Sequence, residues 1–215
     1  MNRREFISIL GSIFLSSNLI NPIENILNPK KEIFLTIDDG PRKNMESFLF
    51  YPSLTFFLIG KKIKDKGYYL ACKALELGHK VGNHSYSHPS FSKISLDQAK
   101  QEIEKTDQIL EKVYNDSGIK RKKLFRFPYG DSGGVNYEQI RYFLNEMGYK
   151  TYRWTRDTDD WRYPLGKRSI TDILNVISQT KNNDIVLMHD LPLTSKLILP
   201  YYRYHSEDYS FKTLN

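Results

Sequence analysis

The sequence predicts one α/β domain in which helices surround a parallel sheet or barrel. Beyond residue 31, short apolar runs alternate with stretches of helical periodicity, and this alternation is typical of βα units. The chain has 215 residues, of which 40% are hydrophobic and 27% are charged, so its length and composition suit a single domain with a full core. Unusual polar residues follow several of the apolar runs, which would gather them at the carboxyl edge of such a sheet.

Seven short, mostly apolar segments are candidate strands. They are Glu32–Asp38, Ser53–Ile59, Lys80–Asn83, Leu124–Phe127, Tyr149–Trp154, Asp184–Met188 and Tyr209–Thr213. Four stretches with an apolar residue at every third or fourth position predict helices between the strands. They run from Ile63 to Leu77, from Leu96 to Val113, from Tyr137 to Met147 and from Ile170 to Ile177. Gly78 and Gly148 would end the first and third helices, and Ser95 with Gln98 forms a capping box for the second.

Residues 1–21 differ from the rest of the chain and are interpreted as an export signal or an N-terminal anchor. Arg3 and Arg4 precede an apolar run from Ile7 to Ile20 that is short for a membrane span. The arginine pair resembles a twin-arginine signal, so we expect an exported protein of the periplasm, the cell envelope or the extracellular space. No small-x-small cleavage site is obvious, which leaves an uncleaved membrane anchor open, and a buried helix is the plainer alternative. Residues 22–31 would be a linker and residues 32–215 the domain.

Cysteine content and charge restrict the possible chemistry. Cys72 is the only cysteine, so the chain cannot form an internal disulfide or a cysteine-based metal site. The formal net charge of +7 would suit an anionic polymer such as nucleic acid or an acidic cell-wall glycan. A solvated lysine-rich surface explains this charge more simply, because the one pronounced basic run is Lys120–Lys123. No basic groove with interleaved stacking aromatics is evident, so nucleic-acid binding is not expected.

Two histidines and two aspartates suggest a metal site with a spare acid. His84 and His88 are four positions apart, and Asp38 and Asp39 come at the end of a candidate strand. Imidazole and carboxylate are ligands that zinc prefers, and three protein ligands leave one coordination position open for water. Each half also has a plainer explanation, since the histidines could share a helix face and the aspartates could belong to a turn. The glycine and proline that flank the histidines favour a loop instead.

Further polar groups follow other candidate strands. They are Arg126, the acidic segment Asp157–Asp160 and His189. Taken alone, Arg126 would be a surface ion pair and the acidic segment a loop or helix cap. His189 is more informative, because an ionisable group that ends an apolar strand is costly unless it is satisfied or used. Together with the metal-type residues, these groups would meet at one barrel mouth, and that combination favours a functional site.

Five segments in chain order resemble the motifs of one family. They are Thr36-Ile37-Asp38-Asp39-Gly40, His84-Ser85-Tyr86-Ser87-His88, Arg126-Phe127-Pro128-Tyr129, Asp157-Thr158-Asp159-Asp160-Trp161 and Leu187-Met188-His189. They resemble the motifs of NodB-type polysaccharide deacetylases (carbohydrate esterase family four), and the resemblance extends from about Glu32 to Thr213. It implies the family's single-domain fold, a distorted (β/α)7 barrel. Family members remove acetyl groups from N-acetylated sugars or, in some cases, from O-acetylated xylan.

The resemblance assigns matched residues to metal binding and proton transfer. The ligands of a divalent metal, usually zinc, would be Asp39, His84 and His88. Asp38 would be the catalytic base and His189 the catalytic acid. A carboxylate bound to an ion loses basicity while its neighbour does not, so adjacent aspartates can serve different purposes. A histidine suits the acid, because a poor amine leaving group must be protonated near neutral pH.

The remaining matches would support these groups or bind the substrate. By resemblance, Arg126 would pair with Asp38 and favour its ionised form, while Asp160 would pair with His189 and favour the imidazolium. A pocket for the acetyl methyl group would be lined by Tyr129, Trp161 and Leu187. The backbone N–H of the matched tyrosine would face the developing oxyanion.

We therefore expect an exported, metal-dependent N-deacetylase that acts on N-acetylhexosamine units of a cell-wall or chitin-like glycan, with peptidoglycan as the first candidate. A xylan-type O-acetyl esterase is an alternative, since the same metal and base suffice for an easier leaving group. A glycan-binding pseudoenzyme would lack catalytic residues, and none is missing. Two departures from the family are Ile37, where phenylalanine is usual, and a short Arg42–Ser53 segment, which leaves the glycan's identity and length open.

Overall fold

The computed structural model of the chain describes residues 29–215, and residues Glu32–Asn215 form one compact unit. The expected export signal at residues 1–21 and most of the expected linker lie outside the described residues. Within the described part of the chain, no helix combines the length and apolar character needed to cross a membrane.

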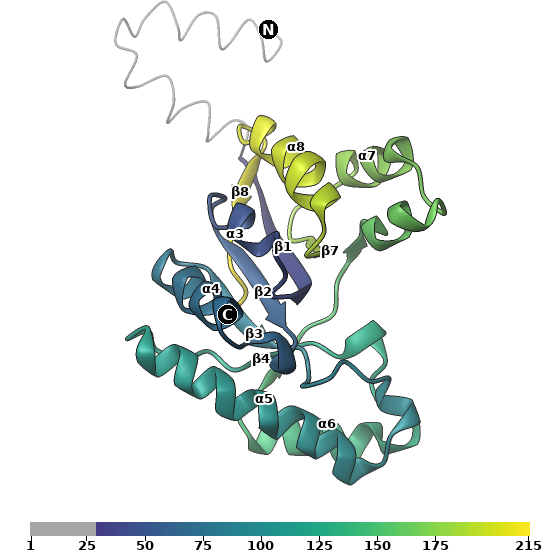
Figure 1. Cartoon of the computed structure of the whole chain (residues 1–215). Helices are drawn as coiled ribbons and strands as arrows, with labels where there is room; N and C mark the ends of the chain where they lie inside the picture. The colour runs from purple at the N-terminus through teal and green to yellow at the C-terminus, as the bar shows by residue number, and fades with distance from the viewer. Residues whose placement is uncertain (1–28) are drawn as a thin grey trace, which may run out of the picture. The chain divides into compact units, whose positions relative to one another are not determined.

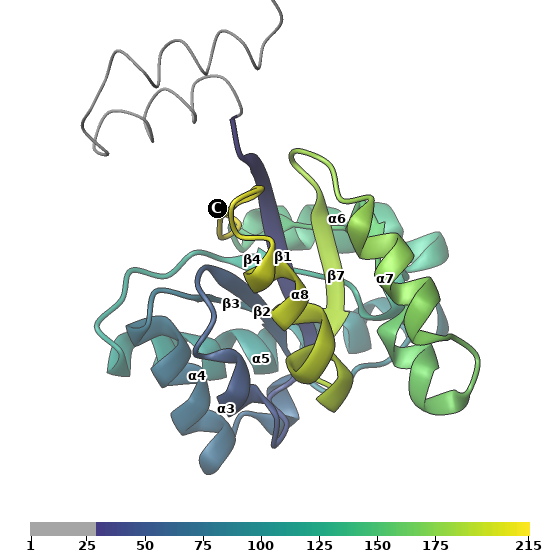
Figure 2. The ribbon, with the colours of Figure 1, turned by 90° about the horizontal axis from the view of Figure 1, so that it is seen from above.

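A parallel sheet forms the centre of this unit. Its strands are β1 (Lys31–Gly40), β2 (Leu54–Leu58), β3 (Lys80–Asn83), β4 (Leu124–Phe125), β5 (Lys150–Thr151), β6 (Arg156–Asp157), β7 (Ile185–His189) and β8 (Tyr209–Phe211). The order across the sheet is β5-β4-β3-β2-β1-β7-β6, each of these pairs is parallel, and β8 pairs with β1. Helices pack around the outside of the sheet (Figures 1 and 2). The predicted distorted (β/α)7 barrel is confirmed.

The barrel is open between β5 and β6, which lie at opposite ends of the strand order. Residues 152–155 connect these two strands and carry the chain across the open side. Tyr152 N–H still donates to Phe125 O at 2.9 Å, and Thr155 N–H donates to Ile185 O at 3.0 Å. The sequence pattern did not predict β6, because this strand consists of Arg156 and Asp157 and has no apolar run.

The helices are α3 (Met45–Phe48), α4 (Lys66–Glu76), α5 (Leu96–Asp116), α6 (Tyr137–Glu146), α7 (Ile170–Ser178) and α8 (Leu199–Tyr204). The four predicted helices correspond to α4, α5, α6 and α7. The predicted capping box of α5 is present: Gln98 N–H donates to Ser95 Oγ at 3.2 Å, and Ser95 N–H donates to Gln98 Oε1 at 2.9 Å. Of the α-helices in residues 29–215, α3 and α8 were not predicted from periodicity, because they are too short to show a helical repeat.

Successive side chains of β1 point to opposite faces of the strand, so one set lies in the core and the other faces the site. Ile33, Leu35 and Ile37 are buried in the main hydrophobic cluster with side chains from the surrounding helices. The alternate residues Thr36 and Asp38 are also buried, and they contact the buried Arg126 instead. Ile37 therefore fills the core position expected for the family's phenylalanine, and its neighbour Asp38 is directed towards the site.

Candidate active site

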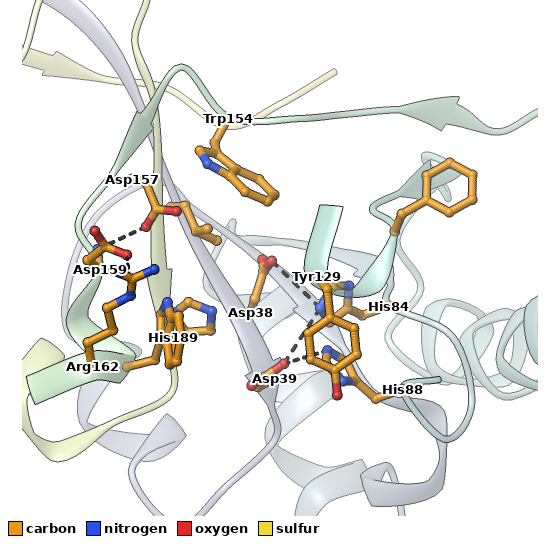
Figure 3. Close-up of a pocket in the computed structure, with 13 residues that line it drawn as sticks. Asp38, Asp39, His84, His88, Tyr129, Trp154, Asp157, Asp159, Arg162 and His189 are labelled. Atoms are coloured by element: carbon orange, nitrogen blue, oxygen red, sulfur yellow. Dashed lines mark hydrogen bonds and ion pairs between the residues drawn. The ribbon is translucent and has the colours of Figure 1, made fainter. Parts of the chain in front are cut away.

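The three predicted metal ligands lie together at the carboxyl ends of β1 and β3 (Figure 3). One ligand atom from each of Asp39, His84 and His88 lies within 4.8 Å of the others. His88 Nε2 is 3.0 Å from Asp39 Oδ1, and His84 Nε2 is 3.6 Å from the same oxygen. The histidines belong to a loop after β3, so the alternative that they share a helix face is wrong.

Hydrogen bonds hold this loop and orient its first histidine. His84 Nδ1 lies 2.8 Å from the backbone carbonyl of Arg126. Because a carbonyl can only accept, Nδ1 carries the proton and Nε2 keeps its lone pair for a metal. Ser85 N–H donates to the Asn83 side chain at 2.8 Å, and His88 N–H donates to Ser85 Oγ at 3.0 Å. Both Ser85 and His88 adopt positive φ angles, 63° and 66°, which these contacts help to maintain.

Asp39 lies among positive groups. Burial opposes ionisation of its carboxyl, but the neighbouring imidazoles of His84 and His88 outweigh burial and hold the pKa well below the usual range. Lys62 Nζ donates to the Asp39 backbone carbonyl at 2.8 Å, and Arg42 Nη2 is 3.3 Å from Oδ2. The side chain is therefore anionic at neutral pH.

Asp38 is held by a buried cation on the other face of β1. Arg126 Nη1 donates to Asp38 Oδ1 at 2.8 Å and to Thr36 Oγ1 at 2.7 Å. Arg126 and Asp38 are only 1% and 3% exposed, so water screens this ion pair little. The second oxygen, Asp38 Oδ2, is 3.7 Å from His84 Nε2 and faces the metal-type cluster. Asp38 thus combines a fixed oxygen with one directed into the site.

His189 ends β7 opposite this cluster and is joined to Asp160. Its Nδ1 is 2.7 Å from Asp160 Oδ1, and its backbone N–H donates to Oδ2 at 2.8 Å. Thr194 Oγ1 also donates to Oδ2, at 2.6 Å. Burial lowers the pKa of His189, but the hydrogen bond and charge of Asp160, together with the charges of Asp38 and Asp39, raise it to about 9. The imidazole therefore carries a proton at neutral pH.

These groups open into a cavity of about 360 Å³. In Figure 3, His84, His88 and Tyr129 lie on one side of Asp38 and Asp39, while His189, Asp159 and Arg162 lie on the other. The cavity lining includes the three predicted substrate-contacting residues Tyr129, Trp161 and Leu187. Tyr129 has φ 58°, and its ring stacks edge-on against His88 with centroids 4.5 Å apart.

Some residues of the site were not predicted from the sequence. The cavity is also lined by Phe127, Trp154, Asp159 and Arg162, and Thr194 donates a hydrogen bond to Asp160. Trp154 and Arg162 lie close in sequence to the matched segment that contains Asp160, and this adjacency could have identified them. Thr194 is in none of the matched segments and gives no such signal.

A family model described as polysaccharide deacetylase matches residues 26–152, more than half of the chain. The chain belongs to the polysaccharide deacetylase family. This deacetylase-family chain is 34% identical over 183 residues to the peptidoglycan-N-acetylmuramic acid deacetylase PdaC of Bacillus subtilis, an alignment that covers 81% of the chain and 36% of PdaC. It is 36% identical over 180 residues to a peptidoglycan-N-acetylglucosamine deacetylase of Bacillus cereus, covering 80% of the chain and 64% of that protein.

A solved structure agrees with the fold of this deacetylase-family chain. It is a mutant of a CE4 family pseudoenzyme of Bacillus anthracis with restored enzymatic activity, and it matches with a TM-score of 0.72 and 25% identity. The match covers 86% of this chain and 66% of the solved one. The chain spans about a third to two thirds of the length of the two curated relatives that it matches.

The donor set of this deacetylase-family chain fits a divalent cation. Two imidazoles and one carboxylate converge, and the hydrogen bond of His84 Nδ1 leaves its Nε2 directed at the cluster. Nitrogen and carboxylate ligands suit zinc and related ions, whereas magnesium and calcium prefer oxygen ligands alone.

Proposed function

We propose that this protein is a metal-dependent N-deacetylase that removes acetyl groups from N-acetylhexosamine units of a cell-wall glycan, with peptidoglycan as the first candidate. One observation carries the proposal. A single cavity is lined by three metal-type ligands and by two titratable groups, Asp38 and His189, each joined to a buried partner of opposite charge. This arrangement places a set of ligands for an ion, a base and an acid around one point.

Asp39, His84 and His88 would hold the ion, for which zinc is the first candidate. When bound, such an ion polarises the acetyl carbonyl and lowers the pKa of water next to it. Asp39 is anionic and His84 is held in the required tautomer, so these two residues are prepared for binding before an ion arrives.

Asp38 would act as the base. Arg126 occupies Oδ1, so Oδ2 is the oxygen that accepts a proton from the attacking water. The new bond forms between the water oxygen and the acetyl carbonyl carbon. The backbone N–H of Tyr129 would then donate to the resulting oxyanion, as the family resemblance implies.

His189 would act as the acid on the opposite side of the cavity. Breaking the bond between carbon and nitrogen would leave a strongly basic amide anion, so the nitrogen must gain a proton as the bond breaks. Asp160 keeps His189 protonated, with the pKa at about 9, and its bond to Nδ1 leaves Nε2 to deliver the proton. The products are acetate and a sugar with a free amine.

The names of the curated relatives support peptidoglycan as the substrate, since both are described as peptidoglycan deacetylases. Such a substrate lies outside the cytoplasm, which agrees with the proposed export by a twin-arginine-like signal in residues 1–21 or with membrane anchoring through that segment.

The decisive experiment measures acetate release by the metal-reconstituted protein from a panel of acetylated glycans. Peptidoglycan and N-acetylglucosamine oligomers are expected to release acetate, and acetylated xylan much less. Preferential release from xylan would instead identify an O-acetyl esterase. Glycan binding without acetate release from any member of the panel would identify a pseudoenzyme and overturn the proposal.

A further inference from the structure

Asp39, one of the three metal-type residues, occupies an irregular position in β1. The register of β1 with β2 shifts between Asp38 and Gly40, as it does at a β-bulge, and Asp39 lies at this shift. Its φ angle of 69° is costly for a residue with a side chain and persists only where other contacts maintain it. The direction of the Asp39 carboxylate therefore depends on what holds the backbone on either side of it.

Asp190, the residue after His189, bonds to the backbone on both sides of Asp39. Its own backbone N–H donates to Asp38 O at 3.0 Å, and its carboxylate Oδ2 accepts a hydrogen bond from the Arg42 N–H at 2.5 Å. The first bond continues the pairing of β1 with β7, in which Asp38 lies opposite His189. The second bond reaches past the irregular residue to the turn that follows it. Asp190 thus connects the end of β7 to both ends of the segment that contains Asp39.

The Asp190 carboxylate is buried against this segment. The residue is 1% exposed, and a Cβ atom on Gly40 would lie 3.1 Å from Asp190 Oδ2. Within residues 29–215, no hydrogen-bond partner meets its other oxygen, Oδ1. A buried carboxylate with an unpaired oxygen opposes folding, so its presence at this position indicates a role other than stability. The group that it holds is the Arg42 N–H.

Two other contacts hold the same segment, but they bind its carbonyl groups. Lys62 Nζ donates to Asp39 O at 2.8 Å, and the Ile59 N–H donates to Gly40 O at 2.8 Å. Both donors belong to the chain that follows β2. Asp190 differs from them, because it accepts from an N–H of the turn and comes from β7. Its loss would leave that N–H without its acceptor and would release the turn on that side.

We propose that Asp190 is a positioning residue that orients Asp39 for metal binding. The inference rests on the proposed function, in which Asp39 is a ligand of the ion. Asp39 Oδ1 lies 3.0 Å from His88 Nε2 and 3.6 Å from His84 Nε2, and a backbone fixed on both sides keeps it there before an ion binds. A preformed ligand set loses less conformational entropy on binding. The end of β7 therefore serves both sides of the cavity, with His189 as the proposed acid and Asp190 behind the metal ligand.

Zinc affinity provides a test that does not require turnover. The metal-free, full-length protein is titrated with Zn²⁺ in competition with a chromogenic chelator, and the binding that His84→Ala removes identifies the site. Asp190→Ala deprives the Arg42 N–H of its acceptor, so we expect the Kd for Zn²⁺ to rise about tenfold. Asp190→Asn keeps an acceptor oxygen in a side chain of the same shape, so its Kd should stay within about threefold of the unmodified value.

Asp184→Ala is the matched control, because Asp184 precedes β7 at the end remote from the site. This residue is also buried, at 8% exposed, and its carboxylate accepts the Lys181 N–H at 2.8 Å. Both alanine variants should lose stability in urea denaturation, and only Asp190→Ala should lose zinc affinity. A destabilised Asp190→Ala that binds Zn²⁺ normally would show a purely structural role and overturn the proposal. An equal loss of zinc affinity in the two variants would overturn it as well.

Asp190→Glu covers the case in which Asp190→Ala does not fold. It keeps the carboxylate but is longer, in a position packed against Gly40, so it should displace the bond to Arg42 and raise the Kd too. A normal Kd in this variant would contradict the proposal. A Kd in Asp190→Asn as high as in Asp190→Ala would also contradict it, because the charge rather than the hydrogen bond would then set the affinity.

Acetate release, measured in parallel, separates this inference from the proposed function. Zinc affinity that depends on Asp190, without acetate release, would support the positioning role and contradict the deacetylase. Acetate release together with a normal zinc affinity in Asp190→Ala would contradict only the positioning role. An unmodified protein without any Zn²⁺ binding that depends on His84 would overturn both.

Discussion

On each side of the cavity, a group proposed to transfer a proton is paired with a buried residue of opposite charge, and the signs are reversed between the two sides. On one side the carboxylate of Asp38 is held 2.8 Å from the guanidinium of Arg126, and on the other the imidazole of His189 is held 2.7 Å from the carboxylate of Asp160. The partners are almost completely buried, at 1% for Arg126 and 0% for Asp160. Asp160 favours the charged form of His189, and Arg126 places a positive charge against Asp38 Oδ1.

The two sides differ in their backbones. Asp39, Ser85 and His88 on the metal side have positive φ angles of 69°, 63° and 66°. On the acid side Asp159 has φ 55°, while His189 itself ends a regular strand. Positive φ is costly for residues other than glycine and persists where other contacts maintain it. The acid side therefore has its charged partner within the protein, while the metal side brings three metal-type side chains to one point. Substitutions of the three proposed ligands should alter metal binding, and substitutions of His189 or Asp160 should alter proton transfer.

Asp38→Asn should have the largest effect on turnover. The amide cannot accept the proton of the attacking water, so we expect acetate release to fall by about 10⁴-fold. Metal content should stay unchanged, because Asp38 is not one of the three proposed ligands. Acetate assays with metal analysis by mass spectrometry would measure both quantities. Asp208→Asn, at an exposed carboxylate, is the control, and near-normal rates in Asp38→Asn would exclude this residue as the base.

His84→Ala tests the metal side directly. Removal of Nε2 leaves two of the three proposed ligands, so the metal content of the purified protein should fall to a small fraction and turnover by about 10³-fold. The control is His205→Ala, at a histidine far along the chain that pairs with Asp208. Full metal occupancy in His84→Ala would contradict the ligand assignment.

His189→Ala tests the acid side. We expect a loss of about 10²-fold on N-acetyl substrates, because the leaving nitrogen is no longer protonated. On an activated acetyl ester the loss should be below about tenfold, since a good leaving group needs little help from an acid. Metal content should not change. Equal losses on the two substrates would argue against an acid role.

Asp160→Asn should shift the pH dependence of turnover. With the pKa of His189 raised to about 9, the acid form is present below that pH and activity should fall as the pH rises through about 9. Without the charge of Asp160, burial dominates and the pKa should fall to the ordinary imidazole value of about 6.5 or below. The fall in activity should then begin near neutrality. An unchanged profile would contradict the pairing.

The same shift has a consequence for stability. The pKa of His189 in the folded protein lies above that of an ordinary imidazole. Its pairing with Asp160 therefore contributes stability that is fully present below about pH 6.5 and is lost as the pH rises through about 9. Urea denaturation at pH 6 and pH 9.5 would show a smaller difference in Asp160→Asn than in the unmodified protein.

The sequence was informative wherever a functional residue follows a recognisable strand. Asp38, His84 and His189 each come at or just after a predicted strand, and parallel strands bring their carboxyl ends to one edge. Local patterns thus predicted both the fold and the place where these side chains meet. The resemblance to a family added which residue pairs with which.

Other parts could not be predicted because they depend on contacts between distant residues. Strand β6 has only Arg156 and Asp157, and it is a strand because β7 pairs with it, not because of its own composition. Likewise, Thr194 is 34 residues from Asp160 in the chain, and only the folded structure brings its hydroxyl to that carboxylate. No local pattern marks a residue whose role is set by such a partner.

Thr194→Val should have the smallest effect of these changes. Valine keeps the shape of threonine but cannot donate to Asp160 Oδ2, so that oxygen would keep the backbone N–H of His189 as its remaining donor. A hydrogen bond to a charged group is worth about 1.5–3 kcal/mol, so the free energy of unfolding should fall by about that amount. Turnover should fall only a few-fold, because the backbone donor still orients the carboxylate towards His189. Thr194→Ser retains the hydroxyl and should restore most of the stability in urea denaturation. If Thr194→Val were as stable as the unmodified protein, the hydrogen bond to Asp160 would contribute nothing to stability.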